Sequence, residues 1–282
     1  MIKSNYNTRK RKFIDFTVKI LSSLAAFIGI FFLLWILFTV FQRGFHALNT
    51  DFFTKLPTPP GLGGGGVINA ITGTTIITLM ATVIGVPIGV MTGVYLSEYG
   101  NKSKFGSIVR FTINLTIGVP SIVVGLFVYA LIVIPTGSFS AWAGAIAQAI
   151  IMLPVVARTS EDMLNLVPNE LREAALAIGM PKWLTILKIV FKSSKSGIIT
   201  GVLLAVARVS GETAPLLFTV MNSQFWMKSL NEPIANLTVT IYNYAMSPFD
   251  DWRQIAWGAS FLITMVVLLL NIIARIIVRE TK

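Results

Sequence analysis

An arginine and a glutamate, Arg208 and Glu212, stand four residues apart inside a largely apolar stretch, residues 197–221. In a helix this spacing places both side chains on one face, one turn apart. Moving a charged side chain to the centre of a bilayer costs about 2.5–3.5 kcal/mol on insertion scales, so an ionisable residue at that depth is typical of a functional site. Arginine offers planar, permanently charged donors that suit an oxyanion. The pair therefore predicts an anion-binding site within a membrane-spanning helix.

The residues around this pair supply hydroxyl groups and interrupt the helix. Glu212 can hold the guanidinium in place and lower the cost of burying it, and Ser210 and Thr213 add hydroxyls. Pro215 has no amide hydrogen, so it frees the carbonyl of Gly211, four residues earlier. Broken spans near the middle of the membrane recur at substrate sites in transporters. The alternative interpretation is a structural ion pair that fixes helix packing.

A second pair, Arg158 and Glu161, lies three residues apart at the inner end of an apolar segment. Two interpretations are open for it. Arg158 either receives the anion where it leaves the membrane on the cytoplasmic side, or simply extends its charge to the interface beside an acidic neighbour.

The composition is that of a polytopic membrane protein. Of 282 residues, 54% are hydrophobic and 12% are charged, whereas soluble domains are about 25% charged. The chain has no cysteine, and its one histidine, His46, lies outside every apolar segment. These facts argue against a Ser-His-Asp triad and a Cys- or His-ligated metal site. The sequence also lacks the phosphate-cradling Gly-x-x-x-x-Gly-Lys-Ser/Thr motif, so we expect no catalytic residues and no cofactor in this chain.

Six apolar segments are long enough to cross a bilayer, which takes about 20 helical residues. We therefore predict an all-α protein with six transmembrane helices. A basic cytoplasmic segment, residues 1–17, precedes a single transmembrane domain, residues 18–282. The first apolar segment is too long for a signal peptide and lacks a cleavage site, so we interpret it as an uncleaved span. The expected spans are 18–41, 67–96, 111–134, 139–157, 197–221 and 254–278.

Lysine and arginine are unequally distributed between the connecting segments. With both termini inside, 18 of the 23 basic residues lie on the cytoplasmic side, and Arg208 lies in a span. This asymmetry is typical of a multi-pass protein of the cell membrane. The net charge of +11 is thus mainly a topology signal, with some attraction to anionic lipids, and it does not indicate nucleic-acid binding. The basic residues left outside are Arg43, Lys55, Lys228 and Arg253.

The longest cytoplasmic connection, residues 158–196, is predicted to contain two short helices. Pro168 and Pro181 can each open a helix, and Gly179 can end the first one. Leu171, Ala174, Ala175 and Ile178 give the first helix a narrow apolar stripe with small residues at its centre, so we expect another surface to approach it closely.

The run Glu173-Ala174-Ala175, followed after three residues by Gly179, resembles the EAA loop of ABC importer permeases. In that family the loop forms a coupling helix that docks in a groove on the ATPase subunit, a helix-in-groove mode of recognition. The family pattern ends in Ile-x-Leu-Pro. Residues 189–192 are Ile-Val-Phe-Lys, so the end of the loop departs from the pattern.

Three further stretches extend the resemblance to the A-type permeases of phosphate-specific ABC importers, from about Gly64 to the C-terminus. They are residues 118–127 (Gly-Val-Pro-Ser-Ile-Val-Val-Gly-Leu-Phe), residues 207–219 (Ala-Arg-Val-Ser-Gly-Glu-Thr-Ala-Pro-Leu-Leu-Phe-Thr) and residues 247–252 (Ser-Pro-Phe-Asp-Asp-Trp). The resemblance implies a type I importer permease that moves phosphate inward by alternating access. It also implies a heterodimer with a C-type permease, two ATPase subunits that bind ATP and Mg²⁺, and an extracytoplasmic phosphate-binding protein.

Two alternative functions stay open. A permease of the same architecture for sulfate, molybdate or another oxyanion is the nearer one. Near neutral pH phosphate keeps a proton that an ionised Glu212 can accept, whereas sulfate has none, so we hypothesise that Glu212 contributes to selection. A membrane anchor or sensor that transports nothing is the other alternative, although an anchor has no need of Arg208.

Overall fold

A computed structural model describes residues 3–101 and 103–279 of the chain, and within these ranges every regular element is a helix. The all-α class predicted above is confirmed. Among the basic residues assigned above to the cytoplasmic side, Lys102 and Lys282 lie outside the described residues, and the side chains of Lys3, Arg9 and Arg279 are likewise not described.

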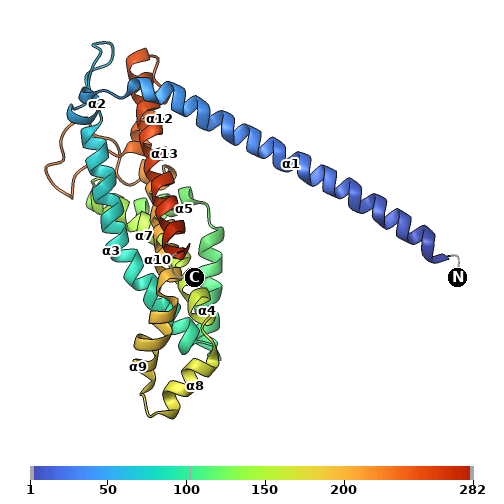
Figure 1. The fold of residues 1–282 in the computed structure, drawn as a ribbon. Coiled ribbons are helices and arrows are strands. Elements are labelled where there is room, and N and C mark those ends of the chain that lie inside the picture. Colours follow the sequence, from blue (N-terminus) through green and yellow to red (C-terminus); the bar gives the residue numbers. More distant parts are fainter. Residues whose placement is uncertain (1–2, 102, 280–282) are drawn as a thin grey trace.

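The order of the helices along the chain can be followed in Figure 1, and the two longest connections are residues 55–67 and 218–236. Their bounds are α1 Lys3–Ala47, α2 Thr50–Thr54, α3 Ile68–Glu98, α4 Lys104–Gly118, α5 Ser121–Val128, the π-helical η1 Tyr129–Val133, α6 Ile134–Thr136, α7 Ala141–Asn165, α8 Asn169–Ala177, α9 Lys182–Thr185, the π-helical η2 Ile186–Val190, α10 Phe191–Ser210, α11 Ala214–Leu217, α12 Leu237–Ala245 and α13 Asp250–Arg279.

Four of the six predicted spans correspond to single long helices, α1, α3, α7 and α13. The predicted span over residues 111–134 is not one straight helix, because α4 and the helix that begins with α5 meet at 104° and form a bent pair. Val119 at this bend is extended, with φ −73° and ψ 129°. A residue before proline is disfavoured in the helical region, and Pro120 itself has no amide hydrogen to continue the helix.

The predicted span 197–221 also differs from the structure. The helix begins much earlier, at Lys182, and ends at Ser210, after which Gly211 leads to the single turn of α11. Arg208 is therefore in the last turn of a long helix and not in the middle of a span. The physical reason is the Gly211–Pro215 stretch, which cannot continue the backbone hydrogen-bond ladder.

Helix α7 is the centre of the bundle, and α3 packs along it. Gly85, Gly89 and Gly93 place one glycine per turn on the face of α3 that meets α7. A Cβ added to Gly89 would lie 2.9 Å from the side chain of Val156. Small residues of this kind let membrane helices approach closely, which strengthens van der Waals packing where no hydrophobic effect drives association.

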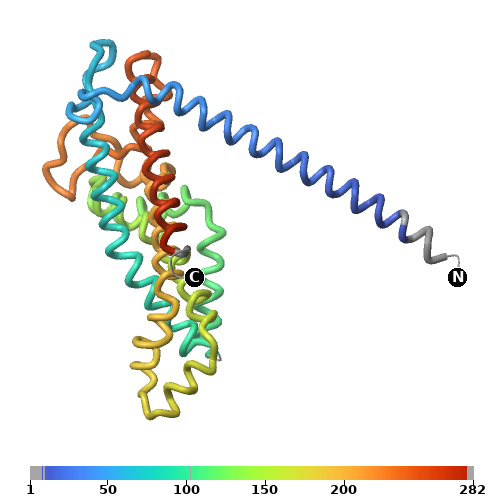
Figure 2. The backbone as a smooth tube through the Cα atoms, in the orientation of Figure 1, coloured from blue at the N-terminus to red at the C-terminus, as the bar shows by residue number. Residues whose placement is uncertain are grey.

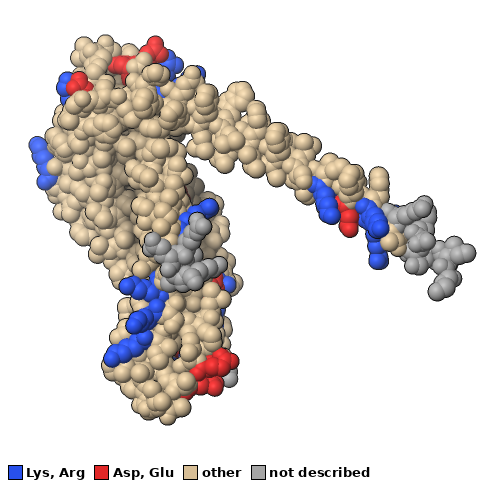
Figure 3. Space-filling view, viewed as in Figure 1, with Lys and Arg blue, Asp and Glu red and all other residues tan. Residues whose placement is uncertain are grey.

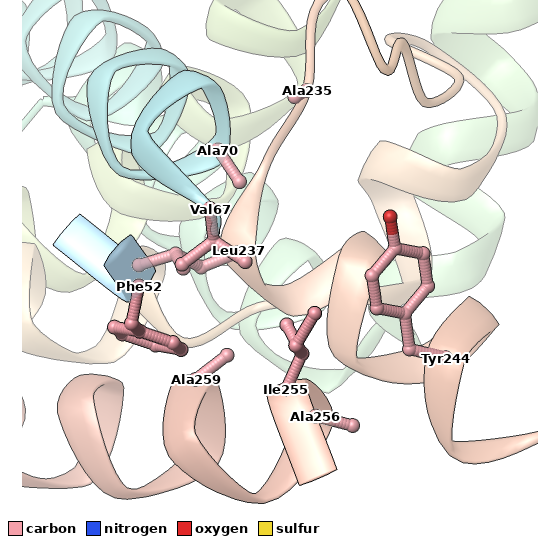
Figure 4. Packing of buried hydrophobic residues seen from close by; sticks show 9 residues of the cluster. All are labelled: Phe52, Val67, Ala70, Ala235, Leu237, Tyr244, Ile255, Ala256 and Ala259. Carbon is pink, nitrogen blue, oxygen red and sulfur yellow. The ribbon is translucent and has the colours of Figure 1, made fainter. Parts of the chain in front are cut away.

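A second core, away from α8 and α9, joins α2, the start of α3, α12 and α13 (Figure 4). Phe52 and Tyr244 are its largest buried side chains, and the ring of Trp252 stacks on Tyr244 with centroids 4.3 Å apart. Burial and the nearby carboxylate of Asp251 raise the pKa of Tyr244 to about 12. Its hydroxyl therefore stays protonated at neutral pH.

Helix α1 leaves the body where it crosses α13 and projects away from it, as Figure 2 shows. Most of its apolar side chains are exposed in the isolated chain. The opposite end of the molecule carries α8 and α9 (Figure 1).

Candidate functional site

Arg208 lines a cavity of about 160 Å³ at the bend between α4 and α5. The break of the third predicted span and the end of α10 therefore form one site. Its lining residues are Thr116, Ile117, Val119, Pro120, Ser121, Val124, Ile151 and Arg208.

Two features of this cavity favour an anion. Helix α5 begins at Ser121, one of the lining residues. The first amides of a helix have no partner within it, and its N-terminus carries a partial positive charge. The guanidinium of Arg208 adds a full positive charge, and Thr116 and Ser121 add hydroxyl groups. Helix start and guanidinium come from different spans and reach the same small volume.

Among the described residues, the guanidinium of Arg208 has only one charged partner, and that contact is long. Its Nε lies 3.8 Å from Oε1 of Glu212, which is longer than a hydrogen bond. The side chain of Arg208 is 53% exposed in the isolated chain, whereas that of Glu212 is 19% exposed. Within the described residues Arg208 donates no side-chain hydrogen bond to protein, so its donors are available to a ligand.

The end of α10 is held in place by two side chains from other helices. Gln148 in α7 is fully buried and donates its Nε2–H to the carbonyl of Val209 at 3.1 Å. The hydroxyl of Thr238 in α12 donates to the carbonyl of Glu212 at 2.9 Å. Both acceptors lie where the helix ladder stops. The backbone that carries Arg208 is thus fixed even though its side chain is not.

Ser210 and Thr213 lie beside this helix end. Ser210 is buried, and its hydroxyl donates to the carbonyl of Ala207 at 2.9 Å. Thr213 precedes α11, and its carbonyl accepts from the amide of Leu216 at 3.1 Å. Neither residue lines the cavity. A role for them in the pathway stays a prediction.

The two sequence stretches that flank the cavity touch each other. A Cβ added to Gly125 in α5 would lie 2.6 Å from the Cα of Pro215 in α11. Backbone therefore packs on backbone here, and only glycine leaves room.

We expect Gly125→Ala to force α5 away from α11, since overpacking of this kind costs about 1–3 kcal/mol. The thermal midpoint in detergent should fall. Gly118→Ala is the matched control, because an added Cβ there meets nothing within 4 Å. Equal thermal midpoints for the two variants would contradict the close contact between Gly125 and Pro215.

Arg158 and Glu161 are neighbours, but each has a closer partner. Glu161 is buried, and its Oε1 accepts from Nε of Arg110 in α4 at 2.6 Å. Arg158 is 46% exposed, and its Nε lies 3.2 Å from Asp162. Its distance to Glu161 is 3.8 Å. Arg110 also donates to the carbonyl of Leu96 at 2.8 Å. Glu161 thus connects α7 to α3 and α4 through Arg110. An anion-receiving role for Arg158 stays a prediction.

The end of the molecule that holds α8 presents an apolar surface. Helix α8 ends at Ala177, as Gly179 predicted, and Gly179 has a φ of +83°. The amide of Met180 donates back to the carbonyl of Ala175 at 3.1 Å, which closes the helix. Ala175 is buried, whereas Glu173, Ala174 and Gly179 are exposed.

The large exposed apolar side chains of α8, α9 and the turn between them are Leu171, Leu176, Ile178 and Trp183. Ile178 is the most exposed of them at 79%. Figure 3 shows the tip free of charged atoms, with basic atoms above it on the α9–α10 side and acidic atoms on the α8 side. The α8–α9 hairpin therefore offers an apolar tip between two charged edges.

Arg172 fixes this hairpin to the ends of α3 and α7, a contact that the sequence analysis missed. Its Nε and Nη2 donate to Oε1 of Glu98 at 3.2 and 3.0 Å. Nη2 also donates to the carbonyl of Leu164 at 2.8 Å, and Nη1 donates to the carbonyl of Val167. Lys182 donates to the carbonyl of Glu98 at 2.7 Å. Movement of the hairpin must therefore pull on α3 and α7.

In the described part of the chain, no group of three or more His, Asp or Glu side chains is placed to hold a metal ion.

The sequence is similar to known transport proteins. Residues 85–280 match the family "Binding-protein-dependent transport system inner membrane component". The Phosphate transport system permease protein PstA of Haemophilus influenzae is 52% identical, covering 93% of each chain. The protein of the same name from Yersinia pestis is 51% identical over 93% of this chain and 89% of its own. PstA 1 of Mycobacterium tuberculosis is 40% identical over 87% and 82%.

Solved structures share the fold at low sequence identity. A bacterial alginate ABC transporter in complex with a periplasmic protein matches with a TM-score of 0.61 and 14% identity over 98% of both chains. An inward-facing MetNI methionine ABC transporter matches with a TM-score of 0.59 and 19% identity over 77% of this chain and 94% of its own. These likenesses show the architecture alone.

Proposed function

Because the chain belongs to the family of binding-protein-dependent inner membrane permeases, and within it to the PstA phosphate permeases, we propose that it forms half of the membrane path for inorganic phosphate in an ABC importer. The observation that carries this proposal is the convergence of Arg208 and the start of α5 on one cavity. The guanidinium and the first amides of α5 bind the oxyanion as it passes. Charge-assisted hydrogen bonds from such donors are about twice as strong as neutral ones.

The site needs a second protein surface to become a closed path. Arg208 is half-exposed in the isolated chain, and the cavity is small. A C-type permease that faces this surface completes the path, and an extracytoplasmic binding protein delivers phosphate to it. Both termini lie in the cytoplasm, together with the α8–α9 hairpin.

The hairpin receives the force of ATP hydrolysis from a separate subunit. Its apolar tip, with Ile178 most exposed, suits a groove on one of two ATPase subunits. Glu173, Ala174, Ala175 and Gly179 form the docking helix and its end. Arg172 passes the movement to α3 and α7, and α7 supplies Ile151 to the cavity wall. A closing ATPase dimer can thus alter the anion site through one continuous helix.

A test of the assembly uses the whole chain with an affinity tag in its native host. We expect a second permease and an ATP-binding subunit to co-purify, and the reconstituted complex to take up phosphate when ATP is supplied. An anchor or sensor would purify without an ATPase. Uptake of sulfate or molybdate in preference to phosphate would assign the chain to another oxyanion.

Glu212 is placed to influence the choice of anion, since its carboxylate lies 3.8 Å from Arg208. We expect Glu212→Gln to narrow the preference for phosphate over sulfate, because the amide no longer repels an anion that carries no proton. Competition uptake with both anions measures this. An unchanged preference would place selection elsewhere, for instance in the binding protein.

A further inference from the structure

Gln148 is a buried amide in α7 whose hydrogen bonding is incomplete. Its side chain is fully buried, and its Nε2–H donates to the carbonyl of Val209 in the last turn of α10 at 3.1 Å. Its Oε1 is also buried and accepts no hydrogen bond from any described residue. Buried polar groups in native proteins are nearly always paired, so an unpaired one needs a specific explanation.

The bond to Val209 does not explain why an amide is buried here. The carbonyl of Val209 already accepts from the amide of Glu212 at 3.1 Å, and the amide of Gly211 donates to it as well. Leaving a buried acceptor unpaired costs more free energy than a single hydrogen bond adds to stability. An apolar side chain of similar size would therefore serve the fold at least as well, so Gln148 has a role beyond stability.

The amide lies between the anion cavity and the break after α10. Val209 directly follows Arg208 in the sequence, and Ile151, one turn after Gln148 in α7, lines the cavity. Val209 and Ile151 belong to one buried apolar cluster with Val124 of α5, which lines the cavity too. Gln148 therefore contacts the helix end that carries Arg208, while its own helix forms part of the cavity wall.

The other end of α7 is bonded to the α8–α9 hairpin. Arg172 donates to the carbonyl of Leu164 at 2.8 Å. Gln148 and Leu164 are 16 positions apart in one continuous helix, which corresponds to about 24 Å. Helices α7 and α10 pack against each other (Figure 1), and over the described ranges the bond from Gln148 is the only side-chain hydrogen bond that joins them. A displacement of the hairpin therefore reaches the end of α10 through this amide.

We infer that Gln148 is a positioning residue for anion transport, an inference that rests on the proposed function. Its amide transmits the position of α7 to the end of α10, and thereby sets how far the guanidinium of Arg208 lies from the start of α5. The bond to Val209 and the unpaired oxygen have opposite effects on stability, so the contact can break and re-form at little cost as α7 moves. Gln148 does not line the cavity and acts on the anion only through Arg208.

The test uses the full chain, reconstituted into proteoliposomes with the subunits that accompany it. Gln148→Met removes the amide and leaves an unbranched apolar side chain of similar length. We expect the maximal rate of ATP-driven phosphate uptake to fall about fivefold, as for the loss of one hydrogen bond, with an unchanged KM for phosphate. The thermal midpoint of the complex should stay the same or rise, because an unpaired oxygen leaves the core. A lower midpoint together with lower uptake would overturn the inference and make Gln148 a structural residue.

Thr78→Val is the matched control. Thr78 lies in α3, and its hydroxyl is likewise buried and without a hydrogen bond to the described residues. Valine has the same shape without the hydroxyl, so the thermal midpoint should again stay the same or rise. Phosphate uptake should equal that of the wild type, because Thr78 has no bond to α10. An equal loss of uptake in this control would overturn the inference, since the loss would then follow from removing any buried polar group.

The double variant Arg208→Gln/Gln148→Met shows whether the amide acts through Arg208. Residues that act through one another are not additive, so the double variant should lose little more uptake than Arg208→Gln alone. A further loss of about fivefold would show that Gln148 acts elsewhere and would overturn the inference. Wild-type uptake in Gln148→Met alone would overturn it as well.

A second variant covers the case in which Gln148→Met does not assemble. Gln148→Asn keeps the amide and shortens its reach by one methylene group, so the same loss in maximal rate is expected. Failure of the wild-type complex to transport phosphate would refute the proposed function, and the inference with it. Normal transport by the wild type and by both Gln148 variants would refute the inference alone.

Discussion

Replacement of Arg208 with glutamine should lower ATP-driven phosphate uptake by about 10–100-fold, while the protein still assembles. A hydrogen bond to a charged group contributes about 1.5–3 kcal/mol, which corresponds to that range. The side chain is half-exposed and makes only a 3.8 Å contact with Glu212, so its loss should leave the fold intact. Uptake into proteoliposomes, together with the thermal midpoint of the purified complex, measures both parts of the prediction.

Arg208→Lys separates charge from geometry. Lysine keeps the positive charge and loses the planar fork, so we expect intermediate uptake. The matched control is Arg275→Gln, which removes an exposed guanidinium from α13 that does not line the cavity. Normal uptake in Arg208→Gln would contradict a role in anion binding. Reduced uptake accompanied by a lower thermal midpoint of the complex would mean that the residue is structural.

The sequence predicts the long helices well, because hydropathy needs only the composition of a window. It does not predict which prolines break a helix. Pro87 and Pro154 lie inside continuous helices, whereas Pro120 lies at a 104° bend and Pro215 follows the end of α10. The residue type is the same in each case. The outcome depends on how the neighbouring helices pack around each proline and on whether they offer the freed carbonyl a partner. A stretch of sequence around the proline does not contain that information.

Ion pairs between distant parts of the chain also cannot be predicted from the sequence of one segment. Helix spacing correctly suggests that Arg158 and Glu161 are neighbours, and they are 3.8 Å apart. The closest partner of Glu161 is nevertheless Arg110, at 2.6 Å and 51 positions earlier in the sequence. Arg110 could be recognised from the sequence only as one more cytoplasmic charge. A buried acidic residue therefore needs the fold before its partner can be named.

Arg172→Gln should uncouple ATP hydrolysis from transport. Arg172 and Glu98 are 17% and 7% exposed, and breaking a buried pair by removing one partner costs about 3–5 kcal/mol. That loss acts on the joint between the α8–α9 hairpin and α3, not on the anion site. We therefore expect ATPase activity to continue in the reconstituted complex while the phosphate imported per ATP falls by about tenfold or more. The control is Lys188→Gln in η2, directly after the hairpin, whose side chain is exposed.

A double-mutant cycle decides whether the ion pair itself transmits the movement. If Arg172 acts through Glu98, then Glu98→Gln should lower the ratio of transport to hydrolysis by a similar factor, and the double variant should lose little more, because residues that share one contact are not additive. The carbonyls of Leu164 and Val167 still accept from Arg172 when Glu98 is changed. A smaller effect of Glu98→Gln alone would therefore shift the transmitting contact from α3 to the end of α7. Losses that simply add would show that the two residues act independently, and the joint proposed here would have to be abandoned.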